Sequence, residues 1–296
     1  MKILMPADIP DYSLLDSGQG EKLESWSGYI IRRPDPNAVW SRRRPEAEWQ
    51  KADAVFHKST GAQRPAPVAK NWTVHRPPPE QWRFRYQDLW FDLQLTPFKH
   101  TGVFPEQAAN WEWFSHLICN STSQPALLNL FGYTGAATLA AAAAGARVCH
   151  VDASKPAVDW AGRNQRLSGL ADKPVRWILD DCVKFVARER KRGARYDAII
   201  MDPPAFGRDP KGRVFKFEDD VPRLLQSCRD ILAGRPLFFL INGYSMGYSA
   251  TVLKNMLAGI LPIERIECGE LHLPESDGPR TLPCSVFARY CAEAGR

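Results

Sequence analysis

The stretch from Leu127 to Asp152, LLNLFGYTGAATLAAAAAGARVCHVD, constrains the fold of this chain more than any other segment. The apolar run 126–131 is typical of a strand buried on both faces, and Gly132 and Gly135 then mark a turn. The alanine-rich residues 136–144 favour a helix, and the apolar run that follows the helix ends in an acid. Strand, glycine turn, helix and strand in this order predict a βαβ unit of a parallel sheet.

In an open sheet of this kind, ligands bind beyond the carboxyl ends of the strands, where Asp152 can accept hydrogen bonds from ribose hydroxyls. Glycine accepts positive φ and lets a ligand lie against the backbone. A dinucleotide-binding dehydrogenase shares these features, but Gly132-x-x-Gly135 is not the G-x-G-x-x-G that cradles a pyrophosphate. A ligand with one ribose and no pyrophosphate fits better, and S-adenosylmethionine is the commonest such cofactor. The alternative is an α/β turn that binds no nucleotide.

Two later segments repeat the pattern of an apolar strand that ends in an acid. The predicted strand 175–179 is followed by Asp180 and Asp181, either of which can accept the exocyclic amino group of an adenine or cap the next helix. The predicted strand 196–201 ends in the sequence Asp202-Pro203-Pro204-Ala205-Phe206. Two prolines cannot extend a central strand, so the backbone must leave the sheet there and present Asp202 to the pocket. Phe206 is then a stacking face for a flat substrate that carries an amine.

The remaining elements continue the alternation of helix and strand. Helices are predicted at 155–167, with Ser154 as N-cap, and at 183–191, 218–232 and 249–259, and a fifth strand is predicted at 236–241. Two final strands, 263–273 and 284–290, have no helix between them and predict an antiparallel hairpin. The sequence therefore predicts an α/β fold for residues 96–296, a Rossmann-like, mostly parallel sheet with an antiparallel closing hairpin.

Residues 1–95 are rich in proline, tryptophan and arginine, and predict a small β-rich accessory region. Strands are expected within 24–32 and 83–95, and a linker at 65–79. Arg42 to Arg44 stand near Trp40 and Trp49, an interleaving of charge and aromatic surface that single-stranded nucleic-acid binders use. The alternative is a basic loop over aromatic core residues. The basic stretch 208–216 is a second candidate for phosphate contacts.

The composition narrows the class of protein. The formal charge of +6, with a pI near 8.9, is compatible with a nucleic-acid partner. Seven cysteines without a C-x-x-C pair argue against a disulfide framework or a structural zinc site. Neither a membrane-spanning run nor a targeting peptide is evident. We therefore expect a cytoplasmic protein that uses no metal.

Taken together, these segments resemble the class I S-adenosylmethionine-dependent methyltransferases, and within them the bacterial 23S ribosomal RNA methyltransferase group. That group carries T-G-x-F upstream, F-x-x-T-G in the first turn, D-C or D-A after the third strand, and D-P-P-x-F after the fourth. The matching segments here are Thr101 to Phe104, Phe131 to Gly135, Asp181 with Cys182, and Asp202 to Phe206. The resemblance covers roughly residues 90 to 290.

The resemblance implies S-adenosyl-L-methionine as cofactor and a base in RNA, with ribosomal RNA favoured, as methyl acceptor. It implies that Asp152 holds the ribose, Asp181 the adenine, the backbone of Gly132 to Gly135 the methionine end, and Asp202 to Pro204 the acceptor. The implied cofactor-binding residues are His100, Gly102, Val103, Phe104, Gln107, Phe131, Gly132, Tyr133, Thr134, Gly135, Asp152, Ala153, Ser154, Asp181, Cys182 and Asp202. The implied catalytic residues are Asp202, Pro203, Pro204 and Phe206.

The chain departs from the group at two points. Gln107 is followed by Ala108, where the group usually has arginine, and Asn242 stands where members that methylate C5 of cytosine keep a cysteine. Methylation at C5 needs a thiolate that first adds to C6 of the pyrimidine. We therefore predict direct transfer to a heteroatom, with a base nitrogen favoured and no covalent enzyme intermediate. A protein or small-molecule acceptor, or an RNA-interaction protein that binds the cofactor without turnover, are the alternatives.

Overall fold

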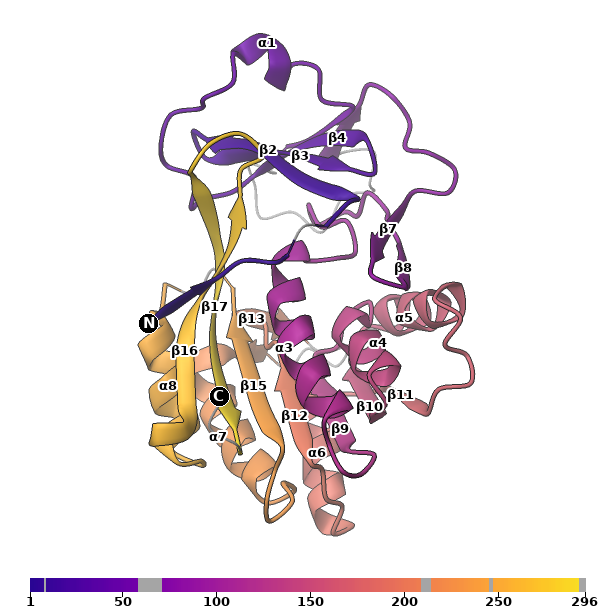
Figure 1. Ribbon diagram of the computed structural model, residues 1–296, viewed down its shortest axis with the longest axis vertical. Helices are drawn as coiled ribbons and strands as arrows, with labels where there is room; N and C mark the ends of the chain where they lie inside the picture. Colours follow the sequence, from indigo (N-terminus) through magenta and orange to yellow (C-terminus); the bar gives the residue numbers. More distant parts are fainter. Residues whose placement is uncertain (8, 58–70, 209–213, 245–246, 293–296) are drawn as a thin grey trace. The chain divides into compact units, whose positions relative to one another are not determined.

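The computed structural model describes residues 1–7, 9–57, 71–208, 214–244 and 247–292, and the chain forms two compact units (Figure 1). The first, which we call the sheet unit, contains residues 1–4, 109–271 and 285–296. The second, the N-terminal unit, contains residues 5–108 and 272–284. The chain therefore passes from one unit to the other several times, and each unit combines segments that lie far apart in the sequence.

An eight-stranded sheet, in the order β1-β16-β17-β15-β12-β9-β10-β11, forms the centre of the sheet unit. β15, β12, β9, β10 and β11 are parallel, whereas β17 runs antiparallel to β15, and β1 pairs in parallel with β16. This arrangement confirms the predicted fold class. The strands are β1 (Lys2–Leu4), β9 (Ala126–Leu130), β10 (Arg147–Asp152), β11 (Val175–Leu179), β12 (Ala198–Met201), β15 (Phe238–Gly243), β16 (Ile266–Pro274) and β17 (Thr281–Cys291).

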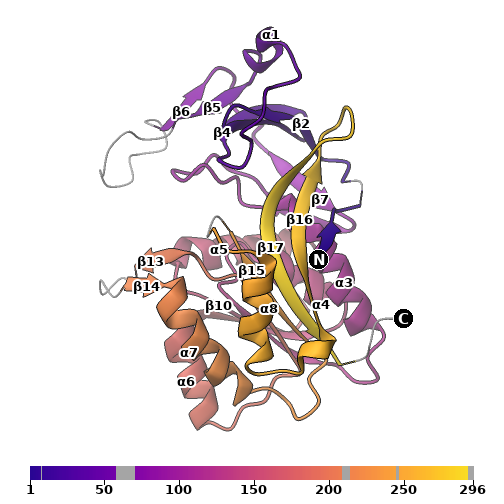
Figure 2. The ribbon, with the colours of Figure 1, turned by 90° about the vertical axis from the view of Figure 1, so that its left-hand side faces the viewer.

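Helices cover both faces of this sheet (Figure 2). One apolar core packs α6, α7 and α8 against side chains such as Ile199 and Phe239. On the opposite face Phe114 of α3 stacks on Phe238, the neighbour of Phe239 in β15, with ring centroids 5.9 Å apart. The helices are α3 (Ala108–Cys119), α4 (Ala136–Ala143), α5 (Lys155–Leu167), α6 (Cys182–Lys191), α7 (Phe217–Arg229) and α8 (Ala250–Ala258), with the short 3-10 turn η2 (Ile263–Arg265). A second 3-10 turn, η1 (Pro105–Gln107), belongs to the N-terminal unit.

The element boundaries predicted from the sequence agree with the structure at several places in the sheet unit. α5 has the predicted bounds, and the backbone N–H of Ala157 donates to Ser154 Oγ at 3.4 Å, which confirms the predicted N-cap. β11 also has its predicted bounds. The fourth strand begins two residues later than predicted, because Tyr196 forms an isolated bridge to Leu232 beyond the end of α7.

The N-terminal unit is built on a five-stranded sheet in the order β2-β3-β4-β5-β6, with a separate pair β7-β8. Strands lie within 24–32 and 83–95 as predicted, and each range contains the turn of a hairpin, where Ser27, Gly28 and Gln87 take positive φ. The predicted linker 65–79 lies outside the described residues up to 70, and beyond them it contains the strand β6 (Trp72–Val74), so the prediction of a linker is wrong there. The elements are β2 (Tyr12–Gly18), β3 (Glu21–Trp26), β4 (Tyr29–Pro34), α1 (Glu46–Trp49), β5 (Ala54–Phe56), β6 (Trp72–Val74), β7 (Arg83–Tyr86) and β8 (Leu89–Asp92).

The units differ in extent from the predicted division into 1–95 and 96–296. The N-terminal unit continues to Ala108 and also includes the tip of the β16–β17 hairpin, residues 272–284. Which segments fold as independent domains stays a prediction.

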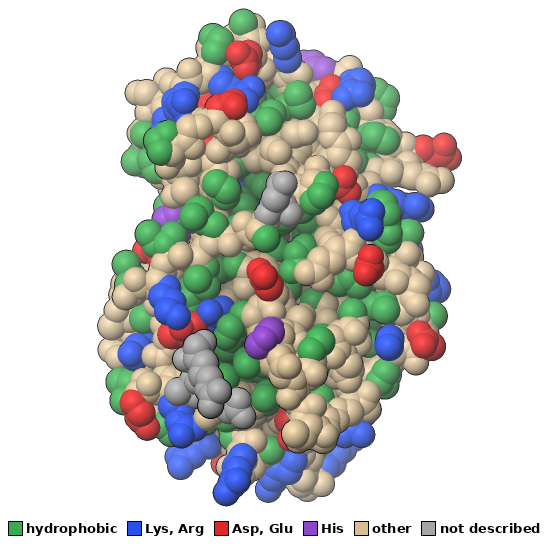
Figure 3. Space-filling model, in the orientation of Figure 1, with side chains coloured by type: hydrophobic (Ala, Val, Ile, Leu, Met, Phe, Trp, Pro, Cys, Tyr) green, Lys and Arg blue, Asp and Glu red, His purple; other side chains and the backbone are tan. Residues whose placement is uncertain are grey.

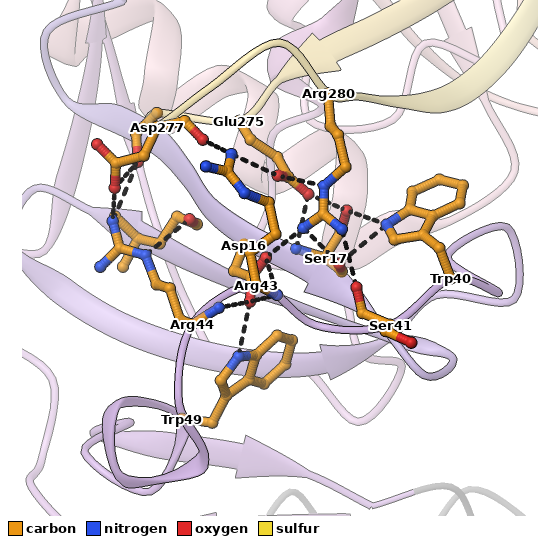
Figure 4. A network of polar contacts seen from close by, with 12 residues as sticks. Asp16, Ser17, Trp40, Ser41, Arg43, Arg44, Trp49, Glu275, Asp277 and Arg280 are labelled. Atoms are coloured by element: carbon orange, nitrogen blue, oxygen red, sulfur yellow. Dashed lines mark hydrogen bonds and ion pairs between the residues drawn. The ribbon is translucent and has the colours of Figure 1, made fainter.

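A polar network holds the hairpin tip within the N-terminal unit (Figure 4). Arg280 donates to Asp16 at 2.8 Å and to Glu275 at 2.9 Å. Asp16 also accepts from the indole N–H of Trp49 at 3.0 Å. Both carboxylates are buried. Removing one partner of a buried ion pair typically costs about 3–5 kcal/mol, since a charge is left unpaired. The network is therefore a strong structural contact between residues at opposite ends of the chain.

Candidate cofactor and acceptor site

The turn between β9 and α4, residues 131–135, takes an unusual backbone conformation. Phe131, Tyr133 and Gly135 have φ of 57°, 49° and 88°. A left-handed conformation costs an ordinary L-residue about 1–2 kcal/mol. Hydrogen bonds compensate for this cost, because the N–H of Gly132 donates to Val151 O at 3.1 Å and that of Gly135 to Gly132 O at 3.0 Å. Backbone strain of this kind is concentrated at ligand sites.

Asp152, at the end of β10, holds this turn in place. Its Oδ2 accepts from the N–H of Tyr133 at 2.9 Å, and its Oδ1 accepts from the N–H of Ser154 at 2.8 Å. A carboxylate offers about four acceptor positions, so two positions remain for hydroxyl groups. Burial raises the pKa of Asp152, although these backbone hydrogen bonds act in the opposite direction. The residue thus fits the predicted contact with a ribose and also positions the turn.

The two glycines of the turn are required by internal packing as well. A Cβ on Gly132 would lie 2.4 Å from Nδ1 of the buried His150 ring, and a Cβ on Gly135 would lie 2.9 Å from Ala161 Cβ. Burial lowers the pKa of His150 to about 3, so the ring is neutral and packs in the core. The sequence suggested ligand access as the reason for these glycines, and the structure adds contacts with β10 and α5.

The end of β11 distinguishes the two candidate acids. Asp181 is the N-cap of α6, where its Oδ1 accepts from the N–H of Lys184 at 2.8 Å. Its Oδ2 makes no hydrogen bond with the part of the chain that the structure describes. Asp180 instead pairs with Arg188. Capping and a contact with an adenine amino group are thus compatible at Asp181.

Cys182 faces away from the sheet edge into the core. The N–H of Phe131 donates to its Sγ at 3.3 Å, and the side chain is buried. Burial raises the pKa of this thiol well above its ordinary value, so the reactive thiolate is disfavoured. The side chain therefore supports the glycine turn, and a cofactor contact by Cys182 stays a prediction.

The Asp202-Pro203-Pro204 turn leaves the sheet at the end of β12, as predicted. Met201 is paired with Leu130 in the register of β12 and β9, and the N–H of Asp202 faces Leu130 O at 3.5 Å. Phe206, 56% exposed, then opens a small antiparallel pair of strands, β13 (Phe206–Arg208) and β14 (Val214–Lys216). This pair was not predicted, and residues 209–213 of the predicted basic loop lie outside the described residues.

The sheet brings these strand ends together at one edge. β12, β9, β10 and β11 are consecutive neighbours, and all four run in the same direction (Figure 1). Strands lie about 4.8 Å apart, so Asp202, the turn 131–135, Asp152 and Asp181 are spread over about 14 Å. Ala153 and Ser154 are exposed beside Asp152, and Thr134 is buried, where its carbonyl accepts from the amide of Asn164 at 3.0 Å.

The upstream candidates His100, Gly102, Val103, Phe104 and Gln107 belong to the N-terminal unit. Gly102 has φ of 111°, and Val103 and Gln107 are buried. The His100 and Phe104 rings lie 5.1 Å apart. Burial, with the nearby cations of the unit, lowers the pKa of His100 to about 3, so its ring is neutral at physiological pH. A cofactor contact by these residues stays a prediction.

Asn242 occupies the position at which related C5 methyltransferases keep a cysteine, and it is a structural residue. It lies within β15, is buried, and its Oδ1 accepts from the side-chain amide of Asn110 at 3.1 Å. Arg289 donates to the Oδ1 of Asn110 at 3.3 Å. Asn242 therefore links β15 to α3 and offers no nucleophile.

The basic N-terminal candidates Arg42 to Arg44 are engaged within their own unit. Arg42 pairs with Glu21 and Glu46, and its guanidinium lies 3.9 Å from the ring centroid of Trp49. Arg44 pairs with Glu48 at 3.0 Å and with Asp277, and Arg43 donates to the backbone of Asp277 (Figure 4). The structure favours the alternative stated above, structural arginines over an aromatic core residue.

Within the described ranges, two kinds of feature are absent. No group of three or more histidine, cysteine, aspartate or glutamate side chains there could hold a metal ion. No helix among the same residues combines the length and apolar character that a bilayer crossing requires.

With this geometry established, comparisons with known proteins identify the family. Residues 33–271 match the model of the S-adenosylmethionine-dependent methyltransferases. The chain belongs to this family. It is thus a methyltransferase enzyme with S-adenosyl-L-methionine as its cofactor, which confirms the prediction from the glycine turn and Asp152.

Solved structures agree with this assignment. An S-adenosylmethionine-dependent methyltransferase of Agrobacterium tumefaciens is 38% identical, covers 99% of this chain and 94% of its own, and superposes with a TM-score of 0.90. A Streptococcus mutans protein with the same family description is 16% identical, with 96% and 76% coverage and a TM-score of 0.70, which shows a shared fold.

A curated relative also shows similarity. The ribosomal RNA large subunit methyltransferase K/L of Syntrophotalea carbinolica is 34% identical over 128 residues, which cover 43% of this chain and 17% of that protein. The chain thus matches less than a fifth of the length of this relative.

Proposed function

We propose that this methyltransferase transfers the methyl group to a nitrogen of a base in RNA, with ribosomal RNA favoured. The observation that carries the proposal is the Asp202-Pro203-Pro204 turn, which leaves the sheet beside the glycine turn and is followed by the exposed Phe206. An aromatic face can stack on a base, a contact worth about 1–3 kcal/mol. The similarity to a ribosomal RNA methyltransferase supports the same class of substrate.

The same edge of the sheet supports a division of roles among the cofactor-binding residues. We assign the ribose to Asp152, whose carboxylate keeps acceptor positions beyond its two backbone hydrogen bonds. We assign the adenine amino group to the second oxygen of Asp181, and the methionine end to the backbone of residues 131–135. These assignments follow the order β9, β10, β11 along the sheet.

S-adenosylmethionine supplies a methyl group that its sulfonium has already activated. The chain then has to orient the acceptor and exclude water, for which positioning alone can contribute several kcal/mol. Asp202 is placed to accept a hydrogen bond from an amino group of the acceptor, and Phe206 to hold the plane of the ring. Neither candidate thiol favours attack on a pyrimidine ring, since burial raises the pKa of both Cys182 and Cys284 well above the ordinary value, and Asn242 stands where C5 methyltransferases keep a cysteine.

Transfer of labelled methyl groups tests the proposal. The enzyme is incubated with labelled cofactor and, separately, with ribosomal RNA, cell protein and small-molecule extract, and the modified nucleosides are identified by mass spectrometry. We expect label in a base nitrogen of RNA, and a loss of about 100-fold in kcat for Asp202→Ala with little change in cofactor Kd. Asp180→Asn, a change at the end of β11, three strands away in the sheet, where Asp180 pairs with Arg188, is the control.

Two outcomes contradict parts of this proposal. Label that enters only protein or only small molecules excludes RNA as the substrate. A denaturation-stable adduct with 5-fluoropyrimidine RNA that disappears in Cys182→Ala or in Cys284→Ala shows covalent catalysis and excludes direct transfer to a nitrogen.

A further inference from the structure

The sheet unit carries a cluster of exposed cations at the edge where its parallel strands begin, opposite the edge described above. We call it the amino-edge patch. It is formed by two stretches of chain. One runs from the end of α6 to the start of β12, and the other from the end of α7 to the start of β15. Figure 3 shows lysine and arginine side chains gathered at the lower end of the molecule, where these elements end in Figure 1. Its members are Lys191, Arg192, Arg195, Arg229 and Arg235.

Backbone hydrogen bonds bring these two segments together. The N–H of Tyr196 donates to Ile231 O at 2.9 Å, and that of Ala233 donates to Tyr196 O at 2.9 Å. Arg190 reaches Asp230 across the ends of the two helices at 3.3 Å. The patch is therefore a fixed surface formed by two connections, although its members are separated by up to about forty residues in the sequence.

Most of the charges of the patch lack an acidic partner among the residues that the structure describes. Arg192 pairs with the buried Glu189 at 2.8 Å. Within the described ranges, no acidic side chain forms an ion pair with Lys191, Arg195, Arg229 or Arg235. Arg42 to Arg44, in contrast, each have acidic partners. An unneutralised cluster of like charges destabilises a folded protein slightly, so it requires a reason other than stability.

Helix dipoles account for only part of the cluster. Cations in the last turn of a helix interact favourably with its free carbonyl groups, by about 0.3–1 kcal/mol each. Lys191 and Arg229 stand in such positions at the ends of α6 and α7. Arg195 and Arg235 lie beyond the helix ends in the connections, where this effect falls off. Helix dipoles therefore do not explain these two arginines, and a negatively charged binding partner would.

We propose that the amino-edge patch binds the phosphate backbone of RNA. Closely spaced, unpaired cations match a polyanion, and phosphate contacts of this type position a nucleic acid without reading its bases. None of the exposed large apolar side chains of the protein lies in residues 188–195 or 229–235. A surface that inserts into a membrane carries such apolar residues beside its cations, so RNA fits better than anionic lipid.

The proposal rests on RNA as the substrate and extends it. The strands of the sheet rise about 3.3 Å per residue, so strands of five or six residues separate the two edges by about 20 Å. An RNA that offers a base at the carboxyl edge can therefore reach the amino-edge patch with nucleotides further along its chain. The patch then adds affinity and orientation to the substrate and does not take part in methyl transfer.

Binding of a fluorescent uridine homopolymer at several salt concentrations tests the patch. The test variant carries three substitutions, Lys191→Gln, Arg195→Gln and Arg235→Gln. The negative slope of log K against log salt should become less steep by about 2 in this variant, because each lost phosphate contact removes about 0.7. The control Arg163→Gln, Arg223→Gln, Lys254→Gln removes the same charge from the middle of α5, α7 and α8 and should keep the slope of the wild type. Cofactor binding by calorimetry should be unchanged in both, which shows that both fold.

Three results would overturn the proposal. These are an unchanged slope in the patch variant, equal losses in patch and control variants, and binding to phosphatidylserine vesicles without binding to RNA. Because homopolymer binding is measured without methyl transfer, the two proposals fail separately. An enzyme that binds RNA at this edge but methylates only a small molecule contradicts the proposed function alone. An enzyme that methylates RNA, but whose patch variant keeps the salt dependence of the wild type, contradicts only the proposal for the amino-edge patch.

Discussion

Replacing Asp152 tests the cofactor site most directly, because the residue has a structural and a binding role that can be separated. Its carboxylate accepts backbone hydrogen bonds from Tyr133 and Ser154 and, in the proposed site, two more from ribose hydroxyls. A hydrogen bond to a charged group contributes about 1.5 kcal/mol or more, so Asp152→Ala should lose about 3 kcal/mol of binding. That loss corresponds to roughly a 100-fold rise in Kd from a micromolar starting value.

Asp152→Asn separates the two roles. Burial raises the pKa of Asp152, so the folded protein binds a proton there more readily than the unfolded chain does. Stability therefore falls as pH rises through this raised pKa, and the ionised carboxylate is unfavourable for folding at neutral pH. The neutral amide removes the cost of a buried charge, but it can accept from only one of the two backbone N–H groups, so the free energy of unfolding at pH 7 should fall by no more than about 1–3 kcal/mol. Binding of the cofactor should weaken by about tenfold or more because an acceptor is lost.

Calorimetric titration with S-adenosylhomocysteine measures the binding, and urea unfolding measures the stability. Asp180→Asn serves as the control, since Asp180 lies at the neighbouring strand end and pairs with Arg188. An Asp152→Asn protein that binds within about threefold of the wild type would refute the assignment of the ribose to this carboxylate. A loss of binding together with a large loss of stability would show that Asp152 acts mainly by holding the turn.

Three further predictions concern the packing and the charges. Gly132→Ala should cost about 1–3 kcal/mol of stability in urea, since its Cβ would meet the His150 ring, and the cost should shrink in a His150→Ala background. Burial alone would raise the pKa of Glu24, but Arg33 lowers it to about 2, so acid titration should remove stability between pH 4.5 and about 2, a loss that Glu24→Gln should lack. Neutralising Arg42 to Arg44 should lower the melting temperature and leave the salt dependence of RNA binding unchanged, whereas a flattened slope would restore their role in RNA contacts.

The sheet unit could be predicted from the sequence because each parallel strand is buried on both faces and ends in a chemically distinct residue. Such strands give continuous apolar runs, and the acid after each run marks the carboxyl edge. The choice between Asp180 and Asp181 could not be made in this way. It depends on which carboxylate reaches the N–H of Lys184 and which reaches Arg188, and neighbouring residues in a sequence carry no information on this.

The N-terminal unit was harder to predict, because its turns lack the usual signals. Ser27-Gly28 forms a tight turn with positive φ at both positions, although asparagine or aspartate is more typical at the first. The sequence therefore predicts strands within 24–32 but does not place the turn between them. The amino-edge patch had a local signal in the basic sequence RERKRGAR at 188–195. Its significance appears only when the end of α7 is seen beside it.

The tip of the β16–β17 hairpin, which completes the polar network, affects how the protein folds during synthesis. Asp16 pairs with Arg280, 264 positions further along the chain, so the N-terminal unit lacks part of its supporting contacts until residue 280 has left the ribosome. Contacts at such separations slow folding, because a long loop must close before they stabilise anything. The first hundred residues should therefore remain open to proteases and chaperones during synthesis, and a fragment that ends before the hairpin should fail to protect its N-terminal half from digestion.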